Sequence, residues 1–246
     1  MKIWNECPHR HRIEYVDKLE GFKGNLHTAF GSAIHSVCEQ ALLKEDLDRE
    51  EHFLEQFAKE ILSLEEKQVE VDASLQQQMM NQYQPIVSSF RDELDNYFGD
   101  CEVVSTEEML YEDVEGHDIK FKGFIDLVVK TPDGKYHILD WKTCSWGWDA
   151  RKKSNKIVNY QLTLYKVFWA QKHQIPLENV ETHFGLLKRT AKRNNTEIFR
   201  VTSGPRKVNN ALTLLNKAVI NIKRKTYLKN RLSCRFCPHY KTERCT

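Results

Sequence analysis

Apolar side chains recur along this chain at two spacings, one typical of helices and the other of strands. From residue 25 to residue 43 they fall three and four positions apart, which predicts an amphipathic helix with a broad apolar face. Helical spacing continues to about residue 98 and returns at 155–173 and 206–228. Runs rich in Val, Ile, Leu, Tyr and Phe predict strands at 102–111, 119–130, 135–143, 181–188 and 196–201. This order of elements predicts an α/β fold.

Two of the predicted strands are joined by the short turn Pro132-Asp133-Gly134. Proline suits the first position of such a turn, and glycine supplies the positive φ that its end requires. A turn centred on Asp133 places Thr131 opposite Lys135. The register of the whole hairpin follows from this pair, because strand partners are counted outward from the turn.

The predicted register brings two acids and one base together. Asp126 falls directly opposite Asp140, and Lys142 shares their face because strand side chains alternate. Directly opposed side chains have Cβ atoms about 4.5–5.5 Å apart, so two carboxylates there repel by roughly 3 kcal/mol at an effective dielectric of about 20. Mg²⁺ or Mn²⁺, which prefer oxygen ligands, would offset the repulsion and could polarise a phosphodiester. The alternative is a surface hairpin with two solvated acids.

Two further pairs flank this hairpin. Gly31 and His35 lie one turn apart on the first predicted helix, and Gln161 and Tyr165 lie one turn apart on a later one. Taken alone, His35 is more simply read as an ordinary core histidine, and Gln161 and Tyr165 as a surface residue and a core residue. Glu39 continues the row of Gly31 and His35 and is not assigned to a metal.

In this order the motifs resemble the PD-(D/E)XK nuclease superfamily, in particular its RecB-like branch. Ile125-Asp126 and Asp140-Trp141-Lys142 are similar to the catalytic core, with Ile where the family name has Pro. The two helical pairs resemble the Gly-x3-His and Gln-x3-Tyr motifs. The resemblance implies a restriction-endonuclease-like core, a central mixed sheet flanked by helices, in a single domain over 1–246 with a helical insertion at 44–100.

The same resemblance implies roles for individual residues. His35, Asp126 and Asp140 would bind Mg²⁺ or Mn²⁺, with the carbonyl of Trp141 as a further ligand. Family members often carry an acid on the preceding strand, here Glu107 or Glu108. The residues implied in catalysis are Asp126, Asp140, Lys142, Gln161 and Tyr165, of which Lys142 positions or activates water and the last two support the DNA.

Seven cysteines supply a second signal, and their odd number disfavours a disulfide framework. Cys234 and Cys237 form a C-x2-C pair, Cys245 follows in the C-terminal tail, and Cys7 lies near the other end of the chain. This arrangement resembles the four-iron cluster of AddB nuclease domains and of CRISPR-associated adaptation exonucleases. It predicts a metal clasp between residue 7 and residues 234–245, holding a 4Fe–4S cluster as a structural staple.

Zinc is the alternative for the clasp, since Cys₄ and Cys₃His sets both suit Zn²⁺. His9 or His239 would then replace one thiolate. The remaining cysteines, Cys38, Cys101 and Cys144, are expected to be buried or bystander thiols.

Composition changes this interpretation little, but charge supports it. The 246 residues carry a net charge of only +2, yet residues 188–231 hold 13 Lys and Arg against one acid. Such a basic segment is typical of nucleic-acid binding, although a solvated basic helix is the simpler explanation when it is considered alone. No apolar run approaches the length of a membrane span. The first residues lack the apolar core of a signal peptide, so we expect a cytoplasmic protein.

These observations together predict a metal-dependent DNA nuclease, and the family resemblance implies an exonuclease more than an endonuclease, acting on single strands or duplex ends. A non-cleaving DNA-binding or recombination-accessory module with a nuclease fold is the main alternative. A structural metal protein is the third. A second copy of the chain, or a helicase or recombination partner, is compatible with the sequence.

Overall fold

The computed structural model describes residues 1–19 and 22–245, without the side chain of Phe236. The chain divides into two compact units, one formed by Gly24–Gly204 and the other by Met1–Lys23 with Pro205–Thr246. We call them the sheet unit and the terminal unit. Whether both act as one nuclease domain over 1–246 stays a prediction.

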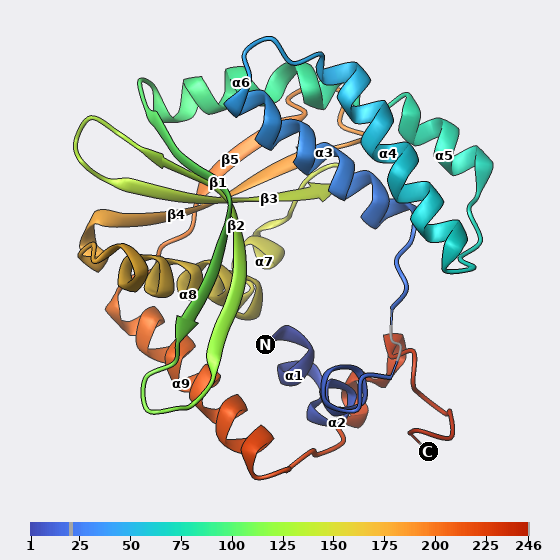
Figure 1. Cartoon of the computed structure of the whole chain (residues 1–246), viewed down its shortest axis with the longest axis vertical. Helices are drawn as coiled ribbons and strands as arrows, with labels where there is room; N and C mark the ends of the chain where they lie inside the picture. Colours follow the sequence, from blue (N-terminus) through green and yellow to red (C-terminus); the bar gives the residue numbers. More distant parts are fainter. Residues whose placement is uncertain (20–21, 246) are drawn as a thin grey trace. The chain divides into compact units, whose positions relative to one another are not determined.

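The sheet unit is built on five strands in the order β1-β2-β3-β4-β5 (Figure 1). Antiparallel pairing joins β1 to β2, β2 to β3 and β4 to β5, whereas β3 and β4 are parallel. The sheet is therefore mixed, and the predicted α/β class is confirmed. The strands are β1 (Glu102–Asp113), β2 (Lys120–Lys130), β3 (Tyr136–Cys144), β4 (Val180–Lys188) and β5 (Thr196–Arg200).

Helices cover both faces of this sheet (Figure 1). On one face, Phe90 of α6 packs edge-on against Trp141 of β3 within a large apolar core. On the other, Trp169 of α8 packs against Tyr136 of β3. The helices of the sheet unit are α3 (Leu26–Leu43), α4 (Arg49–Glu66), α5 (Ala73–Met80), α6 (Gln84–Phe98), α7 (Ala150–Lys153), α8 (Lys156–His173) and the short 3₁₀ helix η2 (Leu177–Asn179).

The two helices beside the predicted site begin at well-formed caps. Asn25 precedes α3, and its side chain accepts a 3.0 Å hydrogen bond from the Thr28 amide while Thr28 Oγ1 accepts one from the Asn25 amide. Asn155 caps α8 in a similar way. Each cap satisfies amides that a helix start otherwise leaves unpaired. Along the chain, α4, α5 and α6 follow α3 and precede β1, in the segment where a helical insertion at 44–100 was expected.

The central hairpin has the predicted register. Leu127 pairs with Leu139 and Lys130 with Tyr136. The amide of Thr131 donates to the Lys135 carbonyl at 3.0 Å, which closes the turn at the expected pair. The turn residues therefore set the register of this hairpin, as they do in hairpins generally.

The terminal unit consists of short helical segments and one long helix. They are α1 (Lys2–Glu6), α2 (Pro8–His11), the π-helical η1 (Arg12–Val16), α9 (Pro205–Lys223) and the 3₁₀ helix η3 (Arg231–Phe236). The last regular helix was expected to reach residue 228, but it ends at Lys223. Lys225 then adopts a left-handed conformation with φ of 52°, which an α-helix cannot continue through. No helix in the described part of either unit is long and apolar enough to cross a membrane.

Candidate active site

The strands bring Asp126 and Asp140 side by side. Counting on from the last paired residues, Leu127 and Leu139, places the two acids opposite each other at the ends of the paired hairpin. The main-chain amide of Trp141 donates a 2.6 Å hydrogen bond to Asp126 Oδ2. Asp140, 2% exposed, pairs through Oδ2 with the ammonium group of Lys142. The predicted convergence of two acids and one lysine is present.

Helix α3 adds two more side chains to this cluster. His35 Nδ1 lies 3.7 Å from Asp126 Oδ2. Glu39, one turn further along α3, is buried, and one ligand atom each from His35, Glu39 and Asp126 lie within 4.8 Å of one another. Glu39 was not assigned to the metal from sequence, and the structure places it among the candidate ligands.

The acid on the neighbouring strand is Glu107 rather than Glu108. Thr106 pairs with Leu127 and Glu108 with Ile125, so Glu107 falls opposite Asp126. Its backbone has a positive φ of 48°. The Glu107 carboxyl group contributes to raising the pKa of both Glu39 and Asp126. A fourth carboxyl group therefore belongs to the site.

Glu108 has a structural role, because its side chain on β1 binds side chains of α8. Its carboxylate accepts hydrogen bonds from the Trp169 indole at 2.9 Å and from the Lys172 ammonium at 2.6 Å, and His173 Nε2 lies 2.6 Å away. Burial favours the neutral acid, but these donors outweigh it and lower the pKa of Glu108 to about 2. Glu108 is thus a fixed anion that ties β1 to α8.

Burial governs the protonation of the site. It raises the pKa of Asp126 and of Asp140 to about 6, against the attraction of Lys142. It raises the pKa of Glu39 to about 9, together with the adjoining Glu107 carboxyl. It lowers the pKa of His35 to about 4, so the imidazole is neutral at pH 7 and has a lone pair for a metal.

Two oxygen atoms in this cluster lack hydrogen-bond partners among the described residues. Glu39 Oε1 has none, and Asp140 Oδ2 lies against the Lys142 ammonium group without hydrogen-bond geometry. Buried polar atoms are normally satisfied, so unsatisfied carboxylate oxygens beside a neutral imidazole fit a divalent cation. The donor set therefore suits Mg²⁺ or Mn²⁺, the ions expected from the sequence.

Helix α8 supplies the remaining two predicted residues. The Gln161 side-chain amide lies 3.1 Å from Asp140 Oδ1 and 3.0 Å from the Tyr165 hydroxyl, and donates to both. Gly123 makes room for Tyr165, because a Cβ atom at that position would lie 2.6 Å from Tyr165 Cε1. Gln161 and Tyr165 therefore reach the cluster as a connected pair that orients Asp140.

Trp141 contributes to the site through its backbone. Its indole is fully buried on the opposite face of the sheet from Asp140 and lies over Gly185. Its amide is engaged by Asp126, as described above. The role of its carbonyl as a metal ligand stays a prediction.

The predicted clasp lies in the terminal unit. One pocket there is lined by all four predicted cysteines, Cys7, Cys234, Cys237 and Cys245, together with His9 and His239. The amide of Asn230 approaches Cys7 Sγ at 3.5 Å, and the Asn230 side chain donates to the Glu6 carbonyl at 2.7 Å. Among residues 1–19 and 22–245, no three potential ligand atoms of this pocket lie within 4.8 Å of one another.

The paired acids and the lysine lie together at the end of the central hairpin of a mixed sheet. The family model of the PD-(D/E)XK nuclease superfamily matches residues 2–244. The chain belongs to this superfamily, as its motifs predicted.

Solved structures support the fold. A crystal structure described as a "putative exonuclease" from Eubacterium rectale is 15% identical, covering 96% of this chain and 82% of that one with a TM-score of 0.59. At this identity the likeness concerns the fold alone. A second structure, that of SSO0001, is 12% identical over 94% of this chain and 90% of its own. Its TM-score of 0.37 is too low to support a shared fold. No curated protein matches the chain significantly.

Proposed function

We propose that this protein is a divalent-metal-dependent deoxyribonuclease, and more specifically an exonuclease that hydrolyses phosphodiester bonds of single-stranded DNA or duplex ends. The observation that carries the proposal is the convergence of Asp126, Asp140 and Lys142. Membership of the PD-(D/E)XK superfamily supports a nucleic-acid substrate. The likeness to the Eubacterium rectale protein supports the fold. The exonuclease class in our proposal follows the description of that protein.

His35, Asp126 and Asp140 would hold the cation, with Glu39 as a further ligand. When bound, Mg²⁺ or Mn²⁺ supplies Lewis acidity for the scissile phosphate and a more acidic bound water. Lys142 has a different task. Burial would lower its pKa, but Asp140 outweighs burial and raises it, so Lys142 is a cation at neutral pH. It therefore orients the attacking water and balances charge on the phosphate rather than removing a proton.

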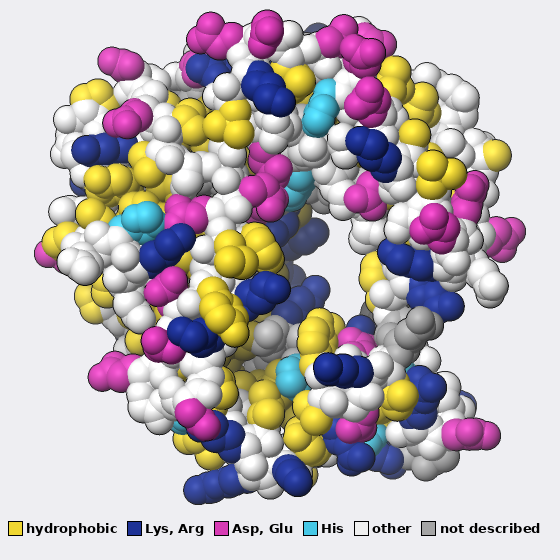
Figure 2. Space-filling view, viewed as in Figure 1, with side chains coloured by type: hydrophobic (Ala, Val, Ile, Leu, Met, Phe, Trp, Pro, Cys, Tyr) yellow, Lys and Arg dark blue, Asp and Glu magenta, His cyan; other side chains and the backbone are white. Residues whose placement is uncertain are grey.

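The terminal unit supplies the electrostatic footprint expected for a nucleic-acid partner. Its sequence holds 16 Lys and Arg against 5 Asp and Glu, a net charge of +11, whereas the sheet unit carries 21 against 30, a net charge of −9. Figure 2 shows Lys and Arg side chains gathered over this unit, whose helices α1, α2 and α9 are labelled in Figure 1. Neutralisation of phosphates by such side chains gives sequence-independent affinity.

We further propose that Cys7, Cys234, Cys237 and Cys245 hold a 4Fe–4S cluster. All four thiols line one pocket although Cys7 and Cys234 are 227 positions apart in sequence. The cluster would act as a staple between two ends of the chain, because it restricts a very long loop in the unfolded state.

A non-cleaving DNA-binding or recombination-accessory module is the alternative function. Burial of several carboxyl groups with raised pKa values opposes folding, and a protein that only binds DNA gains nothing from them. The intact set of acids with Lys142 therefore favours hydrolysis.

Labelled linear and circular DNA, single- and double-stranded, would test the function in Mn²⁺, Mg²⁺ or chelator. We expect metal-dependent loss of linear DNA only. Asp140→Ala and Lys142→Ala should lower the rate by about 10²-fold or more while retaining DNA binding. Asp92→Ala, which removes an exposed acid on α6, is the matched control and should be as active as the wild type. Near-normal turnover by the Asp140 and Lys142 variants would refute the site, and binding without cleavage by the wild type would favour the accessory module.

A further inference from the structure

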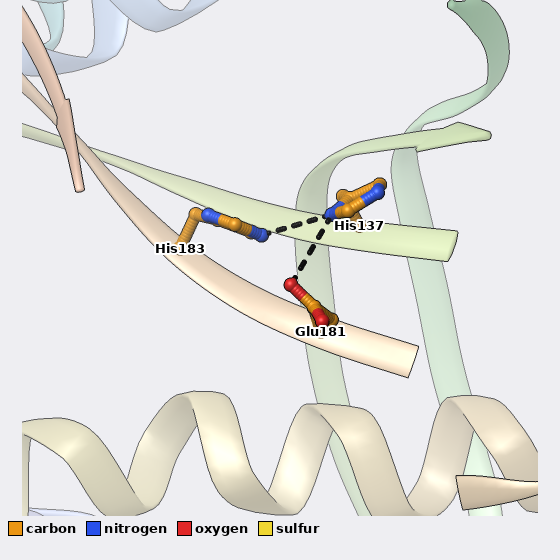
Figure 3. A group of neighbouring side chains, drawn as sticks. All are labelled: His137, Glu181 and His183. Atoms are coloured by element: carbon orange, nitrogen blue, oxygen red, sulfur yellow. Dashed lines mark hydrogen bonds and ion pairs between the residues drawn. The ribbon is translucent and has the colours of Figure 1, made fainter. Parts of the chain in front are cut away.

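A second group of metal-ligating side chains lies on the other face of the sheet. His137 of β3 pairs in register with Glu181 of β4, and His183 follows two residues later on the same face of β4. Because side chains alternate along β3, His137 and Asp140 point to opposite faces. Figure 3 shows His137, Glu181 and His183 converging from the two parallel strands.

The three side chains are already near coordination distance of one another. His137 Nδ1 lies 3.1 Å from His183 Nε2 and 4.0 Å from Glu181 Oε2, and all three ligand atoms fall within 4.8 Å. Ligand atoms of a tetrahedral zinc ion with bonds of 2.0–2.1 Å are about 3.3–3.4 Å apart. To bind zinc in this geometry, the distance between the two imidazole nitrogens must increase by a few tenths of an ångström. The Glu181 carboxylate oxygen must move about 0.6 Å closer to His137 Nδ1.

The outer nitrogen atoms of both imidazoles are engaged, which fixes their orientation. His137 Nε2 lies 2.9 Å from Thr131 Oγ1, whose own proton goes to Asp133 or to the Lys135 carbonyl. Thr131 therefore accepts from His137 Nε2–H, and Nδ1 presents its lone pair to the group. His183 Nδ1 lies 3.3 Å from the Tyr97 hydroxyl. Such second partners are typical of histidines that bind metals.

Glu181 is held in a comparable way. Its Oε1 accepts from Arg200 at 2.9 Å and from Lys135 at 3.2 Å, which leaves Oε2 directed at the imidazoles. Burial lowers the pKa of His137 and lowers that of His183 to about 3, so both rings are neutral at pH 7. Neutral imidazoles and one free carboxylate oxygen form a set of two nitrogen ligands and one oxygen ligand.

We propose that His137, Glu181 and His183 form a second metal site, which binds Zn²⁺ or a similar nitrogen-preferring transition ion and not Mg²⁺. Nitrogen ligands suit zinc, whereas Mg²⁺ prefers oxygen and water. The nearby positive charges of Lys135 and Arg200 repel any dication. An ion that these ligands bind only weakly, such as Mg²⁺, is therefore disfavoured further. Three protein ligands leave a fourth position facing a surface cavity of about 430 Å³ lined by the same residues.

The site is independent of the proposed nuclease chemistry, and it can be tested on the whole 246-residue chain. Crystals equilibrated with Zn²⁺ should show one anomalous peak within bonding distance of His137 Nδ1 and His183 Nε2, and an excess of Mg²⁺ in the same soak should not displace it. A zinc-soaked wild-type crystal without this peak would overturn the proposal. Because this arm uses the wild type alone, misfolding of a variant cannot obscure it.

The zinc content of matched variants provides a second test of the proposal. We expect Glu181→Gln and His183→Asn to hold one zinc ion fewer per chain than the wild type after dialysis against micromolar Zn²⁺, while DNA cleavage in Mg²⁺ persists. His117→Ala removes a histidine outside the group and should keep the wild-type content. Any zinc on the cysteines contributes equally to all four proteins. Equal zinc content in the wild type and in both folded site variants would contradict the assignment.

Discussion

The main-chain amide of Trp141 donates a 2.6 Å hydrogen bond to Asp126 Oδ2, directly beyond the last paired residues of β2 and β3. One strand therefore fixes both acids, Asp140 through its own backbone and Asp126 through this bond. The Trp141 indole anchors the same residue in the core on the other face. Packing behind the sheet should accordingly control the geometry of the site, because a catalytic constellation tolerates only small displacements.

Gly185→Ala should disturb the site from behind. A Cβ atom at Gly185 would lie 2.2 Å from Cε3 of the Trp141 ring, so the indole must move. We expect the free energy of unfolding to fall by about 1–3 kcal/mol or more, as for other overpacked cores. Urea titration measures the stability, and the cleavage rate at saturating Mn²⁺ should fall as well.

Gly204→Ala is the control for this substitution. Nothing lies within 4 Å of a Cβ atom at Gly204, and its φ is not positive. We expect a change in stability of no more than about 1 kcal/mol, since removing a flexible glycine mainly affects the unfolded chain. Equal effects of the two substitutions would show that Trp141 does not transmit packing to the site.

Glu39→Gln should weaken metal binding while leaving the stability of the fold nearly unchanged. The raised pKa of about 9 keeps Glu39 protonated at pH 7 in chelator, so glutamine mimics its state and unfolding should change little. If Glu39 is a metal ligand, the Mn²⁺ concentration for half-maximal cleavage should rise about ten-fold, which corresponds to about 1.4 kcal/mol.

Glu108→Gln should behave in the opposite manner. It removes an anion that Lys172 and the Trp169 indole hold in place, so stability should fall by about 1–3 kcal/mol. The Mn²⁺ requirement should stay as in the wild type. Titration of cleavage against Mn²⁺ for both variants distinguishes the two acids, and an unchanged requirement in Glu39→Gln would remove Glu39 from the ligand set.

The contrast between these acids shows where sequence reasoning stops. The Pro132-Asp133-Gly134 turn sets the register of the central hairpin, so the pairing of Asp126 with Asp140 could be predicted. The choice between Glu107 and Glu108 depends on an irregularity of β1 between Val103 and Ser105, which shifts the register by one residue. No local pattern marks that shift.

Long-range placement was also beyond the sequence. Glu39 lies in the same helical row as His35, but its burial depends on how α3 meets β1 and β2. His137 and His183 come together only because β3 and β4 pair in parallel with a particular register, which residues 46 positions apart do not encode locally. Parallel pairing is set by the crossover that joins the strands and by packing on both faces.

The raised pKa of Asp126, from 3.8 to about 6, predicts a specific dependence of stability on pH. The folded state holds this proton more tightly than the unfolded state, so the acid opposes folding increasingly as pH rises from about 4 to about 6 and fully above that. Asp126→Asn removes the effect. In chelator, the stability of the variant relative to the wild type should therefore increase through this window.

The comparison with the variant is needed because other groups titrate nearby. His35, with a pKa lowered to about 4, gives the opposite trend in both proteins. Chemical denaturation at pH 4, 5, 6 and 7 measures the difference directly. Saturating Mn²⁺ should abolish it at pH 7 by stabilising only the wild type. A difference that stays constant with pH would mean that Asp126 is ionised throughout.

The metal clasp proposed for the terminal unit predicts a visible property. Protein purified without oxygen should be brown, with broad absorbance near about 400 nm, as expected of an iron–sulfur cluster. Tetrahedral zinc requires thiolates about 3.8 Å apart, given Zn–S bonds of about 2.3 Å. No three candidate ligand atoms of the cysteine pocket, within the described residues, lie even within 4.8 Å. A four-iron cluster suits more widely spaced thiolates, because each one binds a different iron atom.

Cys7→Ser and Cys101→Ser form a matched pair for this prediction. Cys7 lines the pocket, whereas Cys101 precedes β1 in the sheet unit and has no place in it. We expect Cys7→Ser to lose the absorbance and to unfold more readily, since the staple restricts the unfolded chain. Cys101→Ser should keep its colour. A colourless wild type that carries one equivalent of zinc after anaerobic purification would replace the cluster with zinc, and colour retained in Cys7→Ser would exclude the N-terminal thiol from the clasp.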